Sequence, residues 1–450
     1  MSPLSLTRIM GGLVAETAAD NVPEAVVQRA KVSLLHNLTV GLAGRNRESV
    51  GHLMAERYWA APAEATLIWN GARVNAEGAA FANAALMNAR SQDDTHAGST
   101  SHPGSPTMAA ALAVAEAHGN SGAECLVAIV LGYEVLCRVG RDFDHRITDR
   151  GFRAAAVLGS FGAIAATARL LRLGADECAH ALGLGANLAG GLSQVWREGS
   201  AEAPLQLAFA ARNGIAAACA AACGARAAVH ALEGPSGFFR AFAGTSGEPL
   251  VALHRLGLDW QLSEVTVKPY PVCAILQGPV GLLLDLIRAH ALGPGALADI
   301  VLGLSPYEAA YPGINHAGPF SGSVAAKMSA QFSLALAAVD RRITPEGLGR
   351  VTDGEVLAVS RRVRVIADPE IVPRQSRMTI RLADGRVLSG SVDTPVGQPS
   401  YDEIARFARS LAPEIGTTET AVDRLAAEVA LLDRAPTVGA LLAAAVACGG

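Results

Sequence analysis

Three separated stretches of the chain hold the polar residues that could do chemistry. Residues 92–104 combine two adjacent carboxylates with His102, residues 151–153 end in Arg153, and residues 267–273 place a lysine in a proline-rich run. An imidazole can give or take a proton near neutral pH, whereas lysine and arginine side chains can pair with carboxylates. His102 also sits in a Gly- and Ser-rich loop before a predicted helix, where a side chain can project into a cleft.

The elements that must position these stretches are mostly helices. Ala- and Leu-rich segments with apolar residues at helical spacing alternate with glycines, which favours a bundle of closely packed helices. A short hairpin around Asn70-Gly71, residues 65–74, is expected to decorate the bundle. The clearest predicted helices cover residues 21–43, 106–118, 123–139, 152–171 and 204–223.

The pattern changes after about Ser263. Alternating apolar residues predict strands at 299–304, 362–366, 378–382 and 387–392, and one helix is expected at 323–339. Helical spacing then resumes from Tyr401. The sequence therefore predicts a mainly α protein, with an all-helical domain at 1–265, an inserted smaller α+β lid domain at 266–398, and C-terminal helices at 399–450 that return to the first domain.

The composition favours a globular cytoplasmic protein. Half of the 450 residues are hydrophobic, which suffices for a large core, and the seven cysteines are scattered, unlike a secreted disulfide framework. The net charge of −4 comes from interspersed acids and bases, so we expect no nucleic-acid partner and no membrane surface. The start of the chain lacks the pattern of a secretory signal, and the apolar stretches near 154–168 and 215–223 are expected to be buried helices.

A series of short motifs resembles the MmgE/PrpD family, which includes 2-methylcitrate dehydratases, cis-aconitate decarboxylases and an iminodisuccinate epimerase. Each motif alone is common, but their combination in this order is specific to the family. The motifs are Leu42-Ala-Gly44, Asp93-Asp-Thr95, His102-Pro-Gly104, Gly132-Tyr-Glu134, Gly151-Phe152, Glu233-Gly234, Lys268-Pro-Tyr-Pro-Val-Cys273 and Asp384-Gly-Arg386.

The resemblance implies a homodimer whose active site lies between a helical domain and a lid, with no metal, nicotinamide or other cofactor. Family members rearrange carbon acids flanked by carboxylates, so the expected partner is a small-molecule carboxylate substrate. Such chemistry needs a base for the C–H proton, an acid for the departing hydroxyl or the new carbanion, and cations that hold the carboxylates.

Two matched residues are assigned the main chemical roles. His102 falls on a family active-site histidine and is predicted to be the general acid/base, although it could instead only cap the following helix. Lys268 matches the family's Lys-Pro-Tyr-Pro lysine and is predicted to bind a substrate carboxylate, although it could also be an exposed hinge lysine. The flanking prolines stiffen this segment, so Tyr270 is grouped with Lys268 as a catalytic residue.

The residues beside these two have less specific assignments. Asp93, Asp94 and Thr95 either line the pocket and orient their neighbours or simply close the loop by hydrogen bonds to the backbone. We assign Asp94 a catalytic role and Asp93 and Thr95 a role in substrate binding. Cys273 is grouped with the substrate-binding residues and is expected to be a packed hydrophobe rather than a nucleophile.

Five positions depart from the family pattern. Ser91 replaces an acid and Arg153 a histidine, Ala203 and Gln206 stand where the family has Lys-x-x-His, and Gln277 replaces a histidine after the motif's cysteine. Because a guanidinium stays protonated, Arg153 cannot act as an ordinary acid or base, but it can clamp a carboxylate. We therefore assign Arg153, Gln206 and Gln277 to substrate binding.

Other residues leave two questions open. Tyr307, Tyr311 or His316 could supply a replacement proton donor, or their stretch could be a lid loop. Cys219 and Cys223 have i,i+4 spacing, but no His or acidic partner stands near them in sequence, so we expect core residues and no metal.

Three functions are compatible with these residues. The first is a lyase that performs acid/base elimination, of the dehydratase or decarboxylase kind, on a small polycarboxylate or related carbon acid. The second is an epimerase or isomerase of a dicarboxylate-like substrate. The third is a non-catalytic family member that binds a ligand or a protein, which the five departures would explain.

Overall fold

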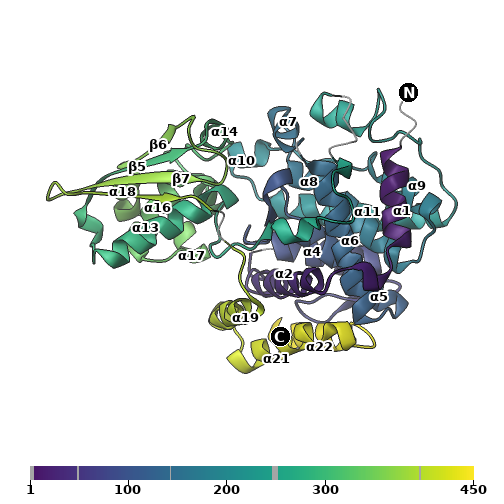
Figure 1. The fold of residues 1–450 in the computed structure, drawn as a ribbon. Coiled ribbons are helices and arrows are strands. Elements are labelled where there is room, and N and C mark those ends of the chain that lie inside the picture. Colours follow the sequence, from purple (N-terminus) through teal and green to yellow (C-terminus); the bar gives the residue numbers. More distant parts are fainter. Residues whose placement is uncertain (1–4, 48–49, 142, 246–251, 395–396, 450) are drawn as a thin grey trace.

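The computed structural model describes residues 5–47, 50–141, 143–245, 252–394 and 397–449, which form a larger helical lobe and a smaller α+β lobe (Figure 1). The predicted mainly α fold with small sheets is confirmed. The larger lobe is built from α1 (Leu6–Glu16), α2 (Glu24–Leu42), α3 (Val50–Tyr58), α4 (Ala76–Asn88), α5 (Gly104–His118), α6 (Gly122–Gly140), α7 (Asp144–Asp149), α8 (Ala154–Leu170), α9 (Ala175–Gly185), α10 (Gln194–Glu198) and α11 (Ala203–Ala222).

Small residues let the central helices of the larger lobe approach closely. α8 packs against α5, α6 and α11. A Cβ at Gly132 on α6 would lie 2.7 Å from the carbonyl oxygen of Gly162 on α8, so neither position has room for a side chain. The predicted hairpin is also present, as β1 (Ala65–Thr66) paired antiparallel with β2 (Arg73–Val74).

One described helix, α11, is long and apolar enough to cross a membrane by length and composition alone. It packs against α4, α5, α8 and α9. These contacts are those of a core helix in the larger lobe, as the sequence predicts.

The smaller lobe contains a four-stranded sheet in the order β6-β5-β7-β8, in which only the β5–β6 pair is parallel. Its strands are β5 (Leu297–Leu304), β6 (Val363–Ala367), β7 (Ser376–Leu382) and β8 (Val387–Val392). Side chains of β7 alternate between buried and exposed, as in a sheet with one covered face. The helices α13 (Gln277–Ala289) and α16 (Ala330–Asp340) cover that face (Figure 1).

The single helix expected at 323–339 is two helices. α15 (Ser323–Met328) ends before Ser329, which has an extended backbone, and α16 then begins. The Ser329 hydroxyl accepts a hydrogen bond from the backbone N–H of Phe332. A serine that caps a new helix competes with continuation of the old one, which the apolar spacing alone does not reveal.

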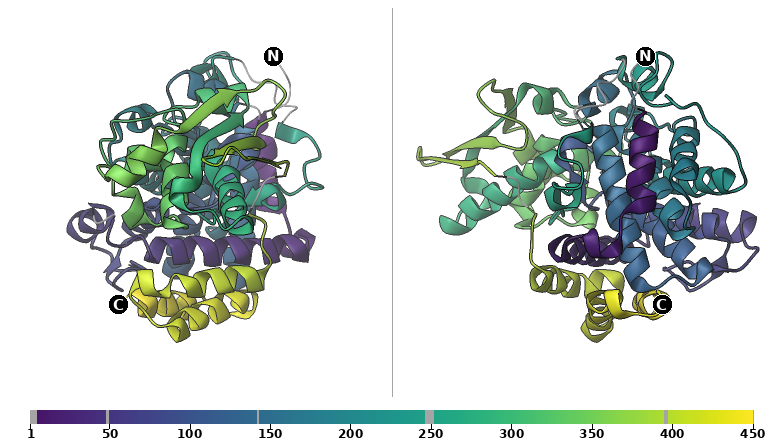
Figure 2. Two further views of the ribbon diagram at one scale, coloured as in Figure 1. Left: turned by 90° about the vertical axis from the view of Figure 1, so that its left-hand side faces the viewer. Right: turned by 45° about the vertical axis from the view of Figure 1, so that its right-hand side comes forward.

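The chain leaves the larger lobe and returns to it at adjacent points. The backbone N–H of Val267 donates to the carbonyl oxygen of Gly397 across 2.7 Å. The returning helices are α19 (Tyr401–Ser410), α20 (Ala412–Ile415), α21 (Glu419–Ala430) and α22 (Gly439–Gly449). Of these, α19, α21 and α22 contact α2, and the returning segment lies beside the larger lobe (Figure 2). The domain boundaries at 265/266 and 398/399, and the role of the smaller lobe as a lid, stay predictions.

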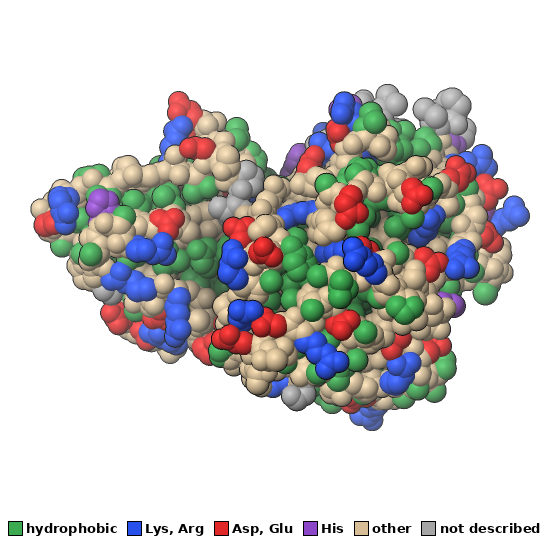
Figure 3. All heavy atoms as spheres, turned by 60° about the horizontal axis from the view of Figure 1, so that its bottom comes forward, with side chains coloured by type: hydrophobic (Ala, Val, Ile, Leu, Met, Phe, Trp, Pro, Cys, Tyr) green, Lys and Arg blue, Asp and Glu red, His purple; other side chains and the backbone are tan. Residues whose placement is uncertain are grey.

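The surface carries both signs of charge. Lys and Arg side chains alternate with Asp and Glu over the face shown in Figure 3. Such interspersion agrees with the even distribution of charge along the sequence.

Candidate active site

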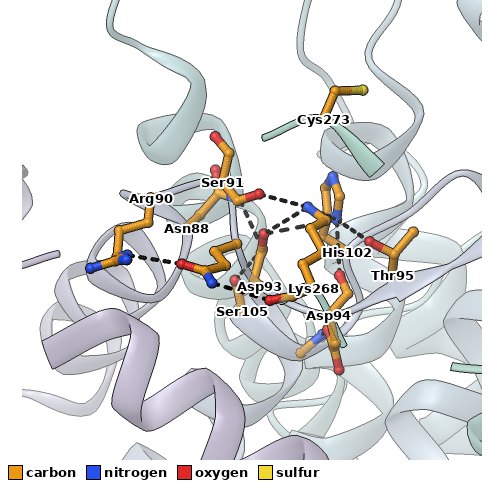
Figure 4. Close-up of polar contacts among 12 residues, drawn as sticks. Asn88, Arg90, Ser91, Asp93, Asp94, Thr95, His102, Ser105, Lys268 and Cys273 are labelled. Atoms are coloured by element: carbon orange, nitrogen blue, oxygen red, sulfur yellow. Dashed lines mark hydrogen bonds and ion pairs between the residues drawn. The ribbon is translucent and has the colours of Figure 1, made fainter. Parts of the chain in front are cut away.

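A two-residue strand pair brings the histidine loop and the lysine segment together. β3 (Thr95–His96) pairs antiparallel with β4 (Val265–Thr266). As a result, the Nζ atom of Lys268 lies 3.4 Å from Nδ1 of His102, although 166 positions separate the two residues in the chain (Figure 4). The two main predicted catalytic residues therefore face the same site.

These residues border a cavity of about 540 Å³ between the two lobes. The larger lobe and its loops contribute Ser91, Thr95, His102, Arg153, Trp196 and Lys268 to its lining, and the residues from Cys273 onward contribute Cys273, Tyr307, Glu308, Tyr311, Met328 and Arg374, among others. Four predicted substrate-site residues besides Lys268 thus line the cavity, namely Thr95, His102, Arg153 and Cys273. Asp93, Asp94, Gln206, Tyr270 and Gln277 do not.

His102 is a neutral imidazole with a defined tautomer. Its Nδ1 lies 2.9 Å from the carbonyl oxygen of Asp94, which can only accept a hydrogen bond, so Nδ1 carries the proton. Burial, and then the charge of Lys268, lower the pKa of His102 to about 3. No described residue bonds to Nε2, which keeps its lone pair available. The ring is therefore set up to accept a proton at Nε2.

Lys268 and Asp93 form a buried ion pair beneath this ring. The Nζ atom lies 3.6 Å from Oδ1 of Asp93 and donates to the carbonyl oxygen of Ser91 across 2.8 Å. Burial lowers the pKa of Lys268, and the Asp93 carboxylate opposes that change. Asp93 thus supports Lys268 from behind rather than lining the cavity.

Asp93 is itself held in its charged form. Burial opposes its ionisation, but the charge of Lys268 outweighs that effect, together with hydrogen bonds to Oδ2 from Ser105 at 2.6 Å and Asn88 at 2.8 Å. The pKa of Asp93 is consequently below its usual range. Asp93 therefore contacts Lys268 without lining the cavity, and its role in substrate binding stays a prediction.

The Asp94 side chain bonds to other protein groups and does not line the cavity, and its catalytic role stays a prediction. Its side chain accepts hydrogen bonds from the backbone N–H of Gly104, at 2.9 Å, and from the hydroxyl of Tyr133. Burial raises the pKa of Asp94 to about 7. The carboxyl group therefore caps the start of α5 and fixes the loop, while its carbonyl oxygen orients His102.

Arg153 lies across the cavity wall with much of its guanidinium fixed. Nη1 donates to the carbonyl oxygen of Ala203 at 2.6 Å and to Oε1 of Gln206 at 3.2 Å, and Nη2 lies 3.4 Å from Oδ1 of Asn88. Its Cζ atom lies 4.9 Å from the ring centroid of Trp196, a cation–π contact. Gln206, predicted to bind substrate, instead orients Arg153 from outside the cavity.

Gln277 bonds to the backbone of the lysine segment at Tyr270, and the predicted roles of both residues at the substrate stay predictions. The Gln277 side chain accepts from the N–H of Tyr270 at 3.1 Å and donates to the carbonyl oxygens of Tyr270 and Val272, each at 3.0 Å. The Tyr270 ring packs against the core of the smaller lobe. A glutamine can make all these bonds because its amide both donates and accepts.

The smaller lobe contributes one cation that the sequence gave no reason to select. Arg374 has a left-handed backbone with φ 70°, and its backbone N–H donates to Oε1 of Glu308 across 3.0 Å. Its Nε lies 3.9 Å from the same carboxylate oxygen. Such a backbone conformation is unusual for a residue other than glycine, so surrounding contacts must hold it. No local motif signals this arginine, because its place in the cavity depends on the packing of the loop before β7.

The remaining sequence candidates divide clearly. Tyr307 and Tyr311 line the cavity, whereas His316 lies outside it, 3.1 Å from the carbonyl oxygen of Pro319 and against the ring of Phe320. Burial raises the pKa of the Cys273 thiol, which makes it a poor nucleophile.

Metal-ligating side chains do not gather in the part of the chain that the structure describes. No group of three or more His, Cys, Asp or Glu residues there could hold a metal ion. Cys219 and Cys223 are exposed on α11 rather than core residues, which corrects that expectation.

Comparison with known protein families agrees with this arrangement. Residues 8–249 match the model of the MmgE/PrpD N-terminal domain, and residues 270–425 match that of the C-terminal domain. The chain belongs to the MmgE/PrpD family. The junction between the two matched parts contains Lys268, at the site where the lobes meet.

MmgE/PrpD relatives with curated descriptions include cis-aconitate decarboxylases. The chain is 28% identical to that of Aspergillus terreus over 94% of its own length and 92% of the relative's. It is 27% identical to those of Mus musculus and Homo sapiens over 59% of its length and 56% of theirs. The likeness to the fungal protein therefore spans both lobes.

Proposed function

We propose that this MmgE/PrpD protein is a cofactor-independent lyase that performs acid/base elimination, of the dehydratase or decarboxylase kind, on a small polycarboxylate. The observation that carries the proposal is a neutral His102, with a free Nε2, in a cavity lined by Lys268, Arg153 and Arg374. The cis-aconitate decarboxylases among its relatives support the same class of reaction. They give the isomerase alternative no support.

The cations suit a substrate with two or more carboxylates. Lys268 and Arg153 line the cavity from the larger lobe's side, and Arg374 lines it from the smaller lobe. Arginine binds carboxylates through paired N–H donors, and desolvated cations stabilise negative charge that develops on an adjacent carbon. A substrate held between the two lobes would therefore be oriented with its reacting carbon near His102.

His102 and a tyrosine would divide the proton transfers. In a dehydration, Nε2 of His102 takes the proton from carbon, and the departing hydroxyl takes a proton from Tyr311. In a decarboxylation, the C–C bond to the carboxylate breaks, CO₂ leaves, and the electron pair on carbon takes the proton of Tyr311. Burial raises the pKa of Tyr311, so its hydroxyl stays protonated at neutral pH. The homodimer and the cytoplasmic location stay predictions.

The test is to incubate the purified protein with cis-aconitate and other small polycarboxylates in D₂O and to follow the products by NMR together with CO₂ release. We expect an alkene product, with or without CO₂. Solvent deuterium on the α-carbon without alkene or CO₂ would reject elimination. If the reaction is a dehydration, the variant His102→Gln should lose at least a hundredfold in kcat, because Nε2 takes the proton from carbon. If it is a decarboxylation, Tyr311→Phe should show that loss instead.

A matched control is His96→Gln. His96 is a buried histidine of the same loop, but its Nδ1 bonds to Ser99 at 2.8 Å and its side chain does not line the cavity. This variant should retain turnover if it folds normally. Equal losses in the two variants would show that loop structure, rather than proton transfer by His102, limits the reaction.

A further inference from the structure

A second cavity, of about 500 Å³, lies in the seam between the lobes. Its lining includes Arg47 and Arg90 from the larger lobe, the first turn of α11, and Lys327 from α15. We call this space the seam cavity, and we call the cavity of about 540 Å³ that His102 and Lys268 line the reaction cavity. No described residue lines both cavities. The seam cavity is thus a separate space.

Lys327 is a buried cation without a partner. The residue is 8% exposed, and its ammonium makes no hydrogen bond or ion pair with any described residue. An unpaired buried charge is costly, so an anion in the same cavity would stabilise the ammonium form of this side chain. Burial, followed by the charges of Arg153, Lys268 and Arg47, lowers the pKa of Lys327 to about 7. The surrounding potential is therefore positive.

The two arginines have counter-ions that face outward. Arg47 pairs with Glu346 at 3.0 Å and Arg90 with Glu414 at 2.5 Å, and both glutamates line a neighbouring surface hollow rather than the seam cavity. Arg90 also donates from Nε to Oε1 of Gln92 at 3.0 Å and from Nη1 to the carbonyl oxygen of Ala43 at 3.4 Å. Each guanidinium has five N–H donors, so these contacts leave Nη2 of Arg90 available. Arg47 and Arg90 can therefore keep donors for a ligand in the cavity.

The start of α11 adds a partial positive charge. This helix has 20 residues, and its N-cap residue Glu202 makes no capping hydrogen bond through its side chain. The N-terminal end of a helix presents unpaired backbone N–H groups and favours negative charge. Glu202 is the one acidic residue among the described residues of the lining, against three basic ones.

We propose that the seam cavity is a second anion site, separate from the reaction cavity, for a small ligand that carries carboxylate or phosphate oxygens, with Lys327 as its central contact. Its walls are connected to the reaction cavity through the backbone. The carbonyl oxygen of Ala203 accepts from Arg153, and that of Lys327 accepts from the N–H of Cys273 at 3.0 Å. A bound anion would therefore contact segments that hold two residues of the reaction cavity.

The experiment measures sulfate binding by calorimetry, because sulfate keeps its double charge across the pH range used. Wild-type protein should bind sulfate at pH 6.5, and the affinity should fall by up to roughly 20-fold at pH 8.5 as Lys327 loses its proton. Lys327→Gln should bind at least tenfold more weakly at pH 6.5. Lys327→Arg should bind at both pH values with little difference, because a guanidinium stays protonated.

Arg374→Met is the control for binding in the reaction cavity, because Arg374 lines that cavity and not the seam cavity. This variant should bind sulfate as the wild type does. In this variant, displacement of sulfate by inorganic phosphate or by tricarballylate tells which class of oxyanion the site prefers. Wild-type affinity in Lys327→Gln, or loss of binding in Arg374→Met, would overturn the proposal. The unfolding midpoint of each variant checks its folding, and the Lys327→Arg pH profile gives a result even if Lys327→Gln is unstable.

Discussion

Replacing Asp93 by Asn should make Lys268 lose its proton at lower pH. The two side chains are 0% and 3% exposed, and their charged atoms lie 3.6 Å apart. At an effective dielectric constant of about 20, this separation corresponds to an attraction of about 4 to 5 kcal/mol. Loss of this attraction would lower the ratio of charged to neutral Lys268 by up to about a thousandfold at a fixed pH.

The assay is the pH dependence of tricarballylate binding, measured by calorimetry on proteins that also carry Lys327→Gln, so that anion binding in the seam cavity does not contribute. Because the carboxylate favours the ammonium form, its loss lowers the pKa of Lys268 further below the usual value, and binding should weaken at a lower pH than in the wild type. A pH–rate profile of kcat/KM with an active substrate should show the same displacement of the basic limb.

Asp94→Asn is the matched control for Asp93→Asn. Its carboxyl group bonds to Gly104 and Tyr133 and does not contact Lys268, so the basic limb should stay in place. If Asp93→Asn and wild type lose tricarballylate binding at the same pH, the ion pair does not govern the charge of Lys268 and the reasoning is refuted.

Three further predictions concern the same site. Lys268→Arg should extend polycarboxylate binding to higher pH, because the guanidinium stays charged. If binding weakens at the same pH as in the wild type, a group other than Lys268 titrates. In steady-state kinetics, Arg153→Met should raise KM for a polycarboxylate at least tenfold, with a smaller effect on kcat. The KM of Arg153→Lys should lie between those of the wild type and Arg153→Met. Burial raises the pKa of Asp94 to about 7, so the folded state binds this proton more tightly than the unfolded chain does. The free energy of unfolding should therefore fall by up to about 4 kcal/mol as the pH rises from about 4 to 7. Urea denaturation of Asp94→Asn should therefore show a flatter pH dependence over that range than the wild type.

The sequence by itself determined the local elements and the family. Apolar residues at every second position placed β7, and helical spacing placed α5, α6, α8 and α11 within a few residues, because these periods reflect one buried face of each element. The Asp384-Gly385 turn after β7 placed β8. The helix break at Ser329 escaped this reasoning, since capping by a side chain competes with a continuous apolar face. The loop with His102 and the segment with Lys268 were recognisable as motifs, because they are short and contiguous.

Only the tertiary structure decided which of these polar residues work together. The pairing of β3 with β4 brings Lys268 to His102, and the packing of the loop before β7 brings Arg374 to the same cavity. Asp94, Gln206 and Gln277 have side chains suited to substrate binding, yet buried backbone groups and Arg153 are their partners. Residue type and spacing specify which bonds a side chain can make, but contacts across the fold determine which of them it makes, because buried polar groups must be paired before a ligand arrives.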